Sequence, residues 1–299
     1  MVAAGWLWIV FTLLAAAGQT ARNAMQRELT AALGTVGATH VRFLFGFPFA
    51  LIFLAVVLAV TRLPVPSLPS AFWPWVLLGA GSQIFSTGLM LAAMNDRSFV
   101  VTIVYTKTEV IQAALFGLLF LGDPLTLPTL AAILIATAGV ALMSLKRGAQ
   151  MTGGLRPTLL GLASGAMLAL SVTGYRGAIL SLGLPNFVLA ATFTLAVGLV
   201  CQSALLTFYL AVRDRNVLLE IARAWRPSLF AGFMGAMASQ FWFLAFALTS
   251  AANVRTLGLA EVLFAQGISI FMFKQATTRR EALGMALIVL GVVLLIWVQ

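Results

Sequence analysis

The chain has 299 residues, of which 62% are hydrophobic and only 9% are charged. A soluble domain usually carries roughly 25% charged residues, and its surface must be wetted by water, so this composition excludes a water-soluble fold. The net charge of +10 comes from basic residues that lie mostly in short loops between apolar runs. That placement favours the lipid bilayer as a partner and argues against nucleic acid.

Ten apolar runs follow one another along the chain, separated by charged residues, Pro or Gly. Each is close to the roughly 20 residues that a helix needs to cross the hydrocarbon core, whereas a β-barrel would show alternating strands of about ten residues. The sequence therefore predicts an all-α integral membrane fold with ten transmembrane helices. The predicted spans are Gly5–Ala24, Val36–Val60, Phe72–Met94, Phe99–Leu121, Leu127–Leu145, Thr158–Ser181, Phe187–Val212, Ser228–Leu248, Ala252–Phe273 and Ala282–Trp297.

The two halves of the chain carry matching residues. Glu109-Val110 aligns with Glu261-Val262, and the same shift of 152 positions places Gly139-Val140 on Gly291-Val292. This predicts two repeats of five helices, residues 1–148 and 149–299, within one membrane domain. Five crossings start the second repeat on the opposite side of the membrane. The repeats are therefore predicted to be inverted around a central cavity, as in alternating-access transporters.

The basic residues also indicate an orientation. Twelve Lys and Arg residues fall in the odd-numbered loops, whereas the even-numbered loops hold only Arg62 and Arg255. Because Lys and Arg accumulate in cytoplasmic loops, the odd-numbered loops are predicted to be cytoplasmic and both termini external. The expected location is the inner (cytoplasmic) membrane of the cell.

Catalytic and metal chemistry find little support in the sequence. Cys201 and His40 are the only cysteine and the only histidine, so we predict no intramolecular disulfide, no metal site and no cofactor. No Gly-x-x-x-x-Gly-Lys-Ser/Thr loop occurs, which argues against ATP-driven transport by this chain. We therefore predict that the protein is not an enzyme.

Ionisable residues inside the predicted spans are the first candidates for a site, because each costs about 2.5–3.5 kcal/mol in the membrane unless it faces a cavity or a partner. Glu109 is expected near the middle of the fourth helix, with Tyr105 and Gln112 on the same face and Lys107 roughly opposite. Glu261 is the counterpart of Glu109 in the ninth helix. Two interpretations stay open: the glutamates hold helices together, or they bind substrate or a proton.

Further polar and aromatic residues extend the candidate set. The additional candidates for lining a cavity are Gln83, Tyr175, Gln240, Trp242 and Gln266. The candidates for a gate or for binding a carboxylate are Arg22, Arg176, His40, Arg42 and Lys107. A guanidinium can bind a carboxylate through two hydrogen bonds. Helix packing is the competing explanation for the aromatic residues, and extension of the side chain to the membrane interface is the competing explanation for the arginines.

Short motifs in corresponding parts of the two halves resemble a known family. Tyr105-Thr106-Lys107-Thr108-Glu109 leads to Leu121-Gly122-Asp123 and Gly139-Val140-Ala141, and Leu259-Ala260-Glu261 occurs in the second half. This pattern is similar to the drug/metabolite transporter superfamily in its ten-helix, EamA-like form. The sequence departs from the family pattern at two positions, where Val110 and Val262 replace the usual prolines. The resemblance implies export or exchange of small metabolites, with the amino-acid exporter branch as the best match.

Together these observations predict a secondary active transporter. The expected activity is export of small metabolites, above all neutral or hydrophobic amino acids, by a monomer that works by alternating access, with protons as the candidate coupling ion. The alternatives within the superfamily are transport of drugs or of other metabolites such as amines, nucleosides or sugar phosphates. An intramembrane enzyme and a structural membrane subunit are the alternatives from other classes.

Overall fold

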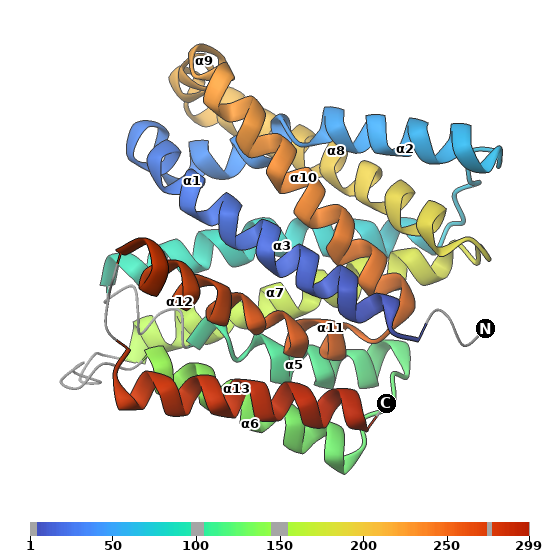
Figure 1. The fold of residues 1–299 in the computed structure, drawn as a ribbon. Coiled ribbons are helices and arrows are strands. Elements are labelled where there is room, and N and C mark those ends of the chain that lie inside the picture. The colour runs from blue at the N-terminus through green and yellow to red at the C-terminus, as the bar shows by residue number, and fades with distance from the viewer. Residues whose placement is uncertain (1–4, 97–104, 145–154, 274–276, 299) are drawn as a thin grey trace. The chain divides into compact units, whose positions relative to one another are not determined.

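The computed structural model describes residues 5–96, 105–144, 155–273 and 277–298 (Figure 1). These residues form helices joined by turns and short loops, and none of them lies in a strand. The α-helices are α1 (Leu7–Leu44), α2 (Phe47–Thr61), α3 (Phe72–Asp96), α5 (Glu109–Phe116), α6 (Leu127–Ser144), α7 (Leu155–Ser181), α8 (Phe187–Arg213), α9 (Arg215–Arg223), α10 (Trp225–Leu248), α11 (Ala251–Gly258), α12 (Ala260–Phe273) and α13 (Arg279–Trp297). A short π-helix, η2 (Gly117–Leu121), continues α5.

The apolar runs of the sequence are the helices of the structure. In the described part of the chain, five helical stretches are long and apolar enough to cross a membrane: Val36–Thr61, Thr158–Ser181, Phe187–Arg213, Ser228–Leu248 and Arg279–Trp297. Leu7–Thr20, Glu109–Leu121 and Leu127–Met143 are shorter apolar helices. The all-α membrane fold predicted from the sequence is confirmed.

The first two predicted spans are divided differently in the structure. Helix α1 continues through the predicted loop to Leu44 and is kinked at Gly34, whose φ of 64° is open to glycine. The second span is then interrupted between Leu44 and Phe47, where α2 begins. Pro48 lies in the first turn of α2 and explains the interruption. Its ring lacks an N–H and would clash with the carbonyl of Leu44 in a continuous helix.

The predicted fourth and ninth spans are also interrupted, each directly before its glutamate. Helix α5 begins at Glu109 after a turn, and Leu259 separates α11 from α12. The same backbone bond occurs at both places: Val110 N donates to Lys107 O at 3.5 Å, and Val262 N donates to Leu259 O at 3.0 Å. These bonds lie 152 positions apart, which is the spacing of the predicted repeat. The expectation that Glu109 lies in mid-helix is therefore wrong.

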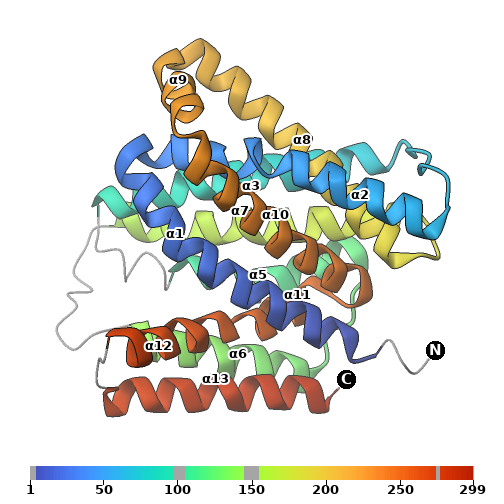
Figure 2. The ribbon, with the colours of Figure 1, turned by 45° about the horizontal axis from the view of Figure 1, so that its top comes forward.

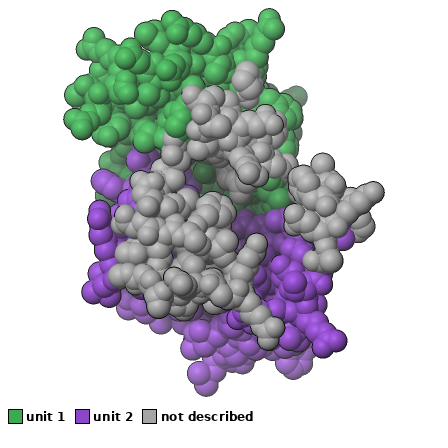
Figure 3. All heavy atoms as spheres, turned by 90° about the vertical axis from the view of Figure 1, so that its left-hand side faces the viewer, with its two compact units in different colours: residues 1–81, 174–249 green, residues 82–173, 250–299 purple. Residues whose placement is uncertain are grey.

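The chain folds into two compact units, and each takes segments from both sequence halves (Figure 3). Unit 1 consists of Met1–Gly81 and Gly174–Thr249, and unit 2 of Ser82–Thr173 and Ser250–Gln299. The boundaries pass through α3 and α7. The two compact units thus differ from the two predicted repeats, residues 1–148 and 149–299. The repeat boundary at 148 stays a prediction.

In unit 1, α1 packs along α10, and α8 packs against α2 and α10. Their contact is apolar around Leu33, Val41 and Leu210, which are buried with Ile221 of α9. Helix α9 was not predicted from the sequence. It is a short helix that begins where the Asp214 side chain accepts a hydrogen bond from Asn216 N.

In unit 2, α6 and α13 lie side by side (Figures 1 and 2). Their glycines allow the close approach: a Cβ atom at Gly139 would lie 2.8 Å from Ile288 N, and one at Gly291 would lie 2.7 Å from Ala136 N. Gly139 and Gly291 are repeat partners, and so are Ala136 and Ile288. The contact is therefore isologous and antiparallel, as a two-fold axis perpendicular to both helices produces. This pattern supports the predicted inversion of the repeats.

The glycine contact generates a prediction for stability. We expect Gly139→Ala and Gly291→Ala to lower the free energy of unfolding by about 1–3 kcal/mol each, because the new methyl group meets backbone atoms of the partner helix. The measurement is the thermal unfolding midpoint of the purified protein in detergent.

Gly88→Ala is the matched control. Gly88 lies in α3 of the same unit, and nothing lies within 4 Å of a Cβ atom built there. Alanine should be neutral or mildly stabilising at this position, since glycine inside a helix costs roughly 0.5–1 kcal/mol. Equal midpoints for the Gly139 variant and this control would refute the tight contact.

Candidate functional site

Two ion pairs in unit 2 join the sequence halves in a crossed manner. Lys107 Nζ pairs with Glu261 Oε1, and Arg255 Nη2 pairs with Glu109 Oε1. Arg255 Nε also donates to Glu109 Oε1, at 3.1 Å. Each glutamate of the predicted repeat thus binds a basic residue from the other half of the chain. We call these four residues the crossed pairs.

The two pairs differ in burial. The side chain of Glu109 is 1% exposed and that of Arg255 is 9% exposed, whereas Lys107 and Glu261 are 16% and 12% exposed. Breaking a fully buried pair leaves an uncompensated charge, which costs several kcal/mol. The Lys107–Glu261 pair is therefore the one that can open to a polar ligand more readily.

The interrupted helices place these charges favourably. Glu109 and Glu261 lie in the first turns of α5 and α12, where the helix dipole stabilises negative charge. Arg255 lies in the last turn of α11, where the dipole stabilises positive charge. The two helix interruptions thus place both glutamates and Arg255 at helix ends where the helix dipole stabilises their charges.

The segment that carries Lys107 is held against α7. A Cβ atom at Gly161 would lie 2.7 Å from Tyr105 Cβ, and one at Gly165 would lie 3.0 Å from Thr106 O. Larger residues at these two glycines would push the segment away. Tyr105, a candidate of the sequence, therefore helps to hold against α7 the segment that carries Lys107 of the crossed pairs.

Gln112 completes this polar group on α5. Its Nε2 donates to Thr108 Oγ1 at 3.0 Å and to Leu162 O at 3.5 Å. Its Oε1 and Glu109 Oε2 are buried and accept no hydrogen bond in the structure. Two acceptor oxygens on neighbouring turns of one helix thus lack donors. An ammonium group, a water molecule or a proton on the carboxylate could satisfy them.

Three other candidates of the sequence lie in unit 1 and have structural contacts there. Gln240 Nε2 donates to Thr192 Oγ1 at 2.7 Å, and Trp242 Nε1 donates to Gln19 Oε1 at 3.1 Å. Tyr175 is buried against Phe243, with 4.7 Å between the ring centroids. Helix packing accounts for these contacts, in line with the competing explanation for the aromatic residues.

The basic candidates have separate surroundings. Arg176 Nη1 donates to the carbonyls of Phe246, at 2.6 Å, and Thr249, so it binds the end of α10. His40 is buried and its Nε2 lies 3.1 Å from Thr207 Oγ1. Arg42 is partly buried in the last turn of α1. The side chain of Arg22 lies outside the described part of the structure.

Gln83 and Gln266 are partly buried in α3 and α12 of unit 2. Among the described residues, no group of three or more His, Cys, Asp and Glu side chains is arranged to hold a metal ion. In the described part of unit 2, the crossed pairs are therefore the charged groups from which we build the candidate site.

Arg255 is a residue of the candidate site that was not predicted from the sequence. It was counted with a loop, and this is wrong because α11 carries it inside a helix, buried against Glu109. The missed signal was an arginine only three residues inside the predicted span Ala252–Phe273, where a charge requires a partner. Its removal from the even-numbered loops leaves the predicted orientation unchanged.

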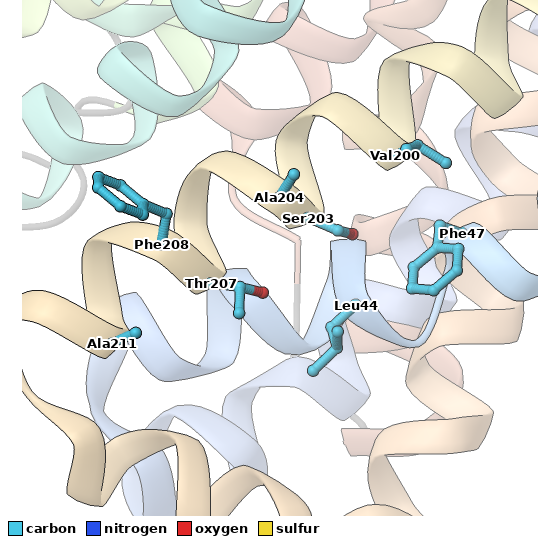
Figure 4. Close-up of a pocket in the computed structure, with 8 residues that line it drawn as sticks. All are labelled: Leu44, Phe47, Val200, Ser203, Ala204, Thr207, Phe208 and Ala211. Carbon is cyan, nitrogen blue, oxygen red and sulfur yellow. The ribbon is translucent and has the colours of Figure 1, made fainter.

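A pocket of about 550 Å³ lies in unit 1 between α8 and the junction of α1 and α2 (Figure 4). Its lining contains no charged side chain, and its polar groups are the hydroxyls of Ser203 and Thr207. Val200 and Phe208 of its lining are well exposed on α8. The pocket has no group to recognise a charged metabolite, so we place the candidate site at the crossed pairs.

Comparisons with known proteins agree with this architecture. A solved protein, described only as "Crystal structure of protein", has the same fold with a TM-score of 0.73 and 15% sequence identity, over 99% of each chain. The search against curated proteins produced no match. Residues 6–145 match the model of the EamA-like transporter family. The predicted resemblance to the drug/metabolite transporter superfamily is confirmed at this level: the chain is a multi-pass membrane protein whose residues 6–145 are similar to the EamA-like transporter family.

Proposed function

We propose that the protein exports small zwitterionic metabolites, first of all neutral and hydrophobic amino acids, by alternating access. The observation that carries this proposal is the pair of crossed ion pairs at two interrupted helices. Interrupted helices and charged groups at their ends are how many secondary transporters build substrate sites within the membrane. The similarity of residues 6–145 to the EamA-like transporter family supports transport, and the charges support the substrate class.

The crossed pairs match a zwitterion in charge. They contain two carboxylates and two cations, so their net charge is zero and a neutral zwitterion can enter without adding an uncompensated charge. In the proposed binding step, the substrate ammonium group replaces Lys107 at Glu261, and the substrate carboxylate binds the released Lys107. The more buried Glu109–Arg255 pair stays closed and holds α5 against α11.

The predicted inversion of the two repeats would supply a route for alternation. The isologous contact of α6 and α13 supports two related halves, and such halves can exchange conformations to open a site first to one side and then to the other. A proton is the proposed coupling ion, with Glu261 as its carrier in the substrate-free state, because a proton and the substrate ammonium group would compete for this carboxylate.

Flux through reconstituted vesicles tests the proposed substrate class. We expect saturable counterflow of leucine in proteoliposomes, inhibition by other neutral amino acids, and stimulation by a proton gradient. Isopentylamine and 4-methylpentanoate, which each lack one of the two charges of leucine, should compete more weakly by roughly tenfold or more, because each leaves one site charge without its partner.

Two results would count against this substrate class. One is equal competition by leucine and isopentylamine, which would indicate an amine or drug transporter of the same family. The other is the absence of saturable leucine counterflow in vesicles whose protein is shown to be folded by its thermal unfolding transition.

Substitution of the two glutamates separates their roles. Glu261→Gln should lower leucine flux by at least about tenfold and lower the unfolding midpoint less than Glu109→Gln does, because the Lys107–Glu261 pair is the less buried of the two. Glu109→Gln should mainly lower stability, by up to about 3–5 kcal/mol, because it removes the carboxylate that is hydrogen-bonded to the buried Arg255 guanidinium.

Glu220→Gln is the matched control, since it makes the same chemical change at an exposed residue of α9. Its flux should equal that of the unmodified protein. If Glu261→Gln also keeps full flux and its proton dependence, the Lys107–Glu261 pair is structural and the proposed binding step is wrong.

The proposed orientation places the odd-numbered loops in the cytoplasm and both termini outside the cytoplasmic membrane. Cys201 is the only cysteine, so single-cysteine variants can be made on a Cys201→Ala background. We expect an impermeant maleimide to label Ser67→Cys in intact spheroplasts and Asn216→Cys only after permeabilisation. The opposite labelling pattern would place both termini in the cytoplasm.

A further inference from the structure

The apolar pocket of unit 1 follows one face of α8. Ser203, Thr207 and Ala211 of its lining are spaced by four positions, so they lie on the same side of the helix. On this helix the lining extends from Val200 to Ala211, eleven positions that correspond to about 16 Å. The hydrocarbon core of a bilayer is roughly 30 Å thick. The pocket is therefore about as long as one leaflet is deep.

One end of the pocket lies at the charged end of α8. The helix carries no charged residue before Arg213, which is its last residue. Nearby in the chain, the guanidinium carbon of Arg226 lies 5.5 Å from the centre of the exposed Trp225 ring. Tryptophan and arginine are typical of the interface between membrane and water. The Ala211 end of the pocket thus lies close to the lipid headgroups, and the Val200 end lies in the hydrocarbon.

Arg215 is held at the headgroup end of the pocket. Its Nε donates to the carbonyl oxygen of Ala211 at 2.8 Å, and Ala211 lines the pocket. Among the described residues, the two Nη groups of this exposed side chain have no partner. Paired guanidinium donors suit the oxygens of a phosphate group. Residues 213–226 contain four arginines and two acidic residues, so this end of the pocket is positively charged.

Two hydroxyl groups line the pocket on the side of α8 that faces the junction of α1 and α2 (Figure 4). Ser203 is 5% exposed, and its Oγ has no hydrogen-bond partner in the structure. Thr207 Oγ1 lies 3.1 Å from His40 Nε2. Because His40 Nδ1 has no acceptor, the neutral ring keeps its hydrogen on Nε2 and donates it to Thr207, whose own hydroxyl hydrogen then needs an acceptor. A purely hydrocarbon occupant would leave both hydroxyls without one.

We propose that this pocket binds an anionic glycerophospholipid of the surrounding leaflet. One acyl chain fills the apolar part of the pocket, the ester carbonyl groups accept hydrogen bonds from Ser203 and Thr207, and the phosphate group binds the Nη groups of Arg215. The order of phosphate, esters and chain in the lipid matches the order of these groups along α8. Under the proposed orientation this end of α8 is cytoplasmic, where anionic lipids give the membrane a negative surface potential.

The spacing of the polar groups fits one lipid molecule. Ser203 and Ala211 are eight positions apart, or about 12 Å along the helix, and the Arg215 guanidinium is anchored at Ala211. A phosphate group, a glycerol ester and the hydrogen bonds at both ends can span this distance. The site lies in unit 1, so it is separate from the crossed pairs of unit 2 and independent of the proposed substrate.

Non-specific contact with bulk lipid is the competing explanation for the pocket. Bulk lipid covers any apolar surface and does not distinguish between headgroups. A guanidinium fixed by a hydrogen bond and two hydroxyls on the pocket wall favour recognition of the headgroup, the esters and the chain together. Selectivity between lipids with the same chains therefore separates the two explanations.

Thermal unfolding of the purified full chain in detergent tests the site. We expect dioleoyl phosphatidylglycerol to raise the unfolding midpoint at lower concentrations than dioleoyl phosphatidylcholine does. Glycerol phosphate, which lacks the acyl chains, should leave the midpoint unchanged. Arg215→Gln should weaken the apparent affinity for phosphatidylglycerol by about fivefold, because a cation near the membrane surface is lost.

Two further variants test the wall of the pocket. Ala204 lines the pocket and is exposed, so Ala204→Phe places a ring in the space of the acyl chain without disturbing the buried core. This variant should lose the selective stabilisation by phosphatidylglycerol. Ser203→Ala should weaken the stabilisation by a few-fold. Without lipid, it should be at least as stable as the unmodified protein, because an unsatisfied buried hydroxyl is removed.

Arg223→Gln and Leu205→Phe are the matched controls. They remove an exposed arginine from the other end of α9 and enlarge an exposed residue of α8 that lies outside the pocket lining. Both should respond to phosphatidylglycerol like the unmodified protein. Equal stabilisation by the two lipids, or an unchanged response in Arg215→Gln, would reduce the pocket to ordinary lipid contact and overturn the proposal. Selectivity that persists in Ala204→Phe would place the lipid elsewhere and overturn it as well.

Discussion

The central constraint on this structure is that a charge inside an apolar unit needs a partner of opposite charge or a set of hydrogen bonds. The sequence contains only 26 charged residues besides His40, 18 basic and 8 acidic, and among the described residues few of their side chains lie in the interior of a unit. These interior charges are compensated by different kinds of partner. Glu109 and Glu261 receive cations from the opposite sequence half, and Arg176 receives backbone carbonyls. The crossed pairs thus join segments that are far apart in the chain.

The interruptions of the helices follow from the same constraint. A break exposes backbone N–H and C=O groups that cannot be left bare in a membrane. At Lys107–Val110 and Leu259–Val262 these groups turn back in tight i→i−3 bonds, and the glutamates next to them benefit from the helix dipoles. Charge and backbone polarity are therefore gathered at the same two places, where a polar ligand meets the smallest desolvation penalty. This makes the breaks in unit 2 suitable for a transported zwitterion.

The sequence predicted the helices well because a run of about 20 apolar residues has few other stable states. Predicted ends such as Phe72, Phe187 and Leu248 coincide with helix ends in the structure. The interruptions were missed because hydropathy averages over them, although Pro48 was a readable signal for one. The pairing of Glu109 with Arg255 could not be predicted either. It depends on which helix ends meet in three dimensions, and no local pattern joins two side chains that lie 146 positions apart in the chain.

The electrostatic balance of the crossed pairs bears on the proposed selectivity. The four charges sum to zero, so a ligand gains affinity there only by exchanging partners, which keeps binding reversible. A ligand with both an ammonium group and a carboxylate can exchange with Lys107 and Glu261 without leaving a charge uncompensated, whereas an amine supplies only one of the two charges. The proposed preference for zwitterions over amines therefore follows from the balance of these four side chains.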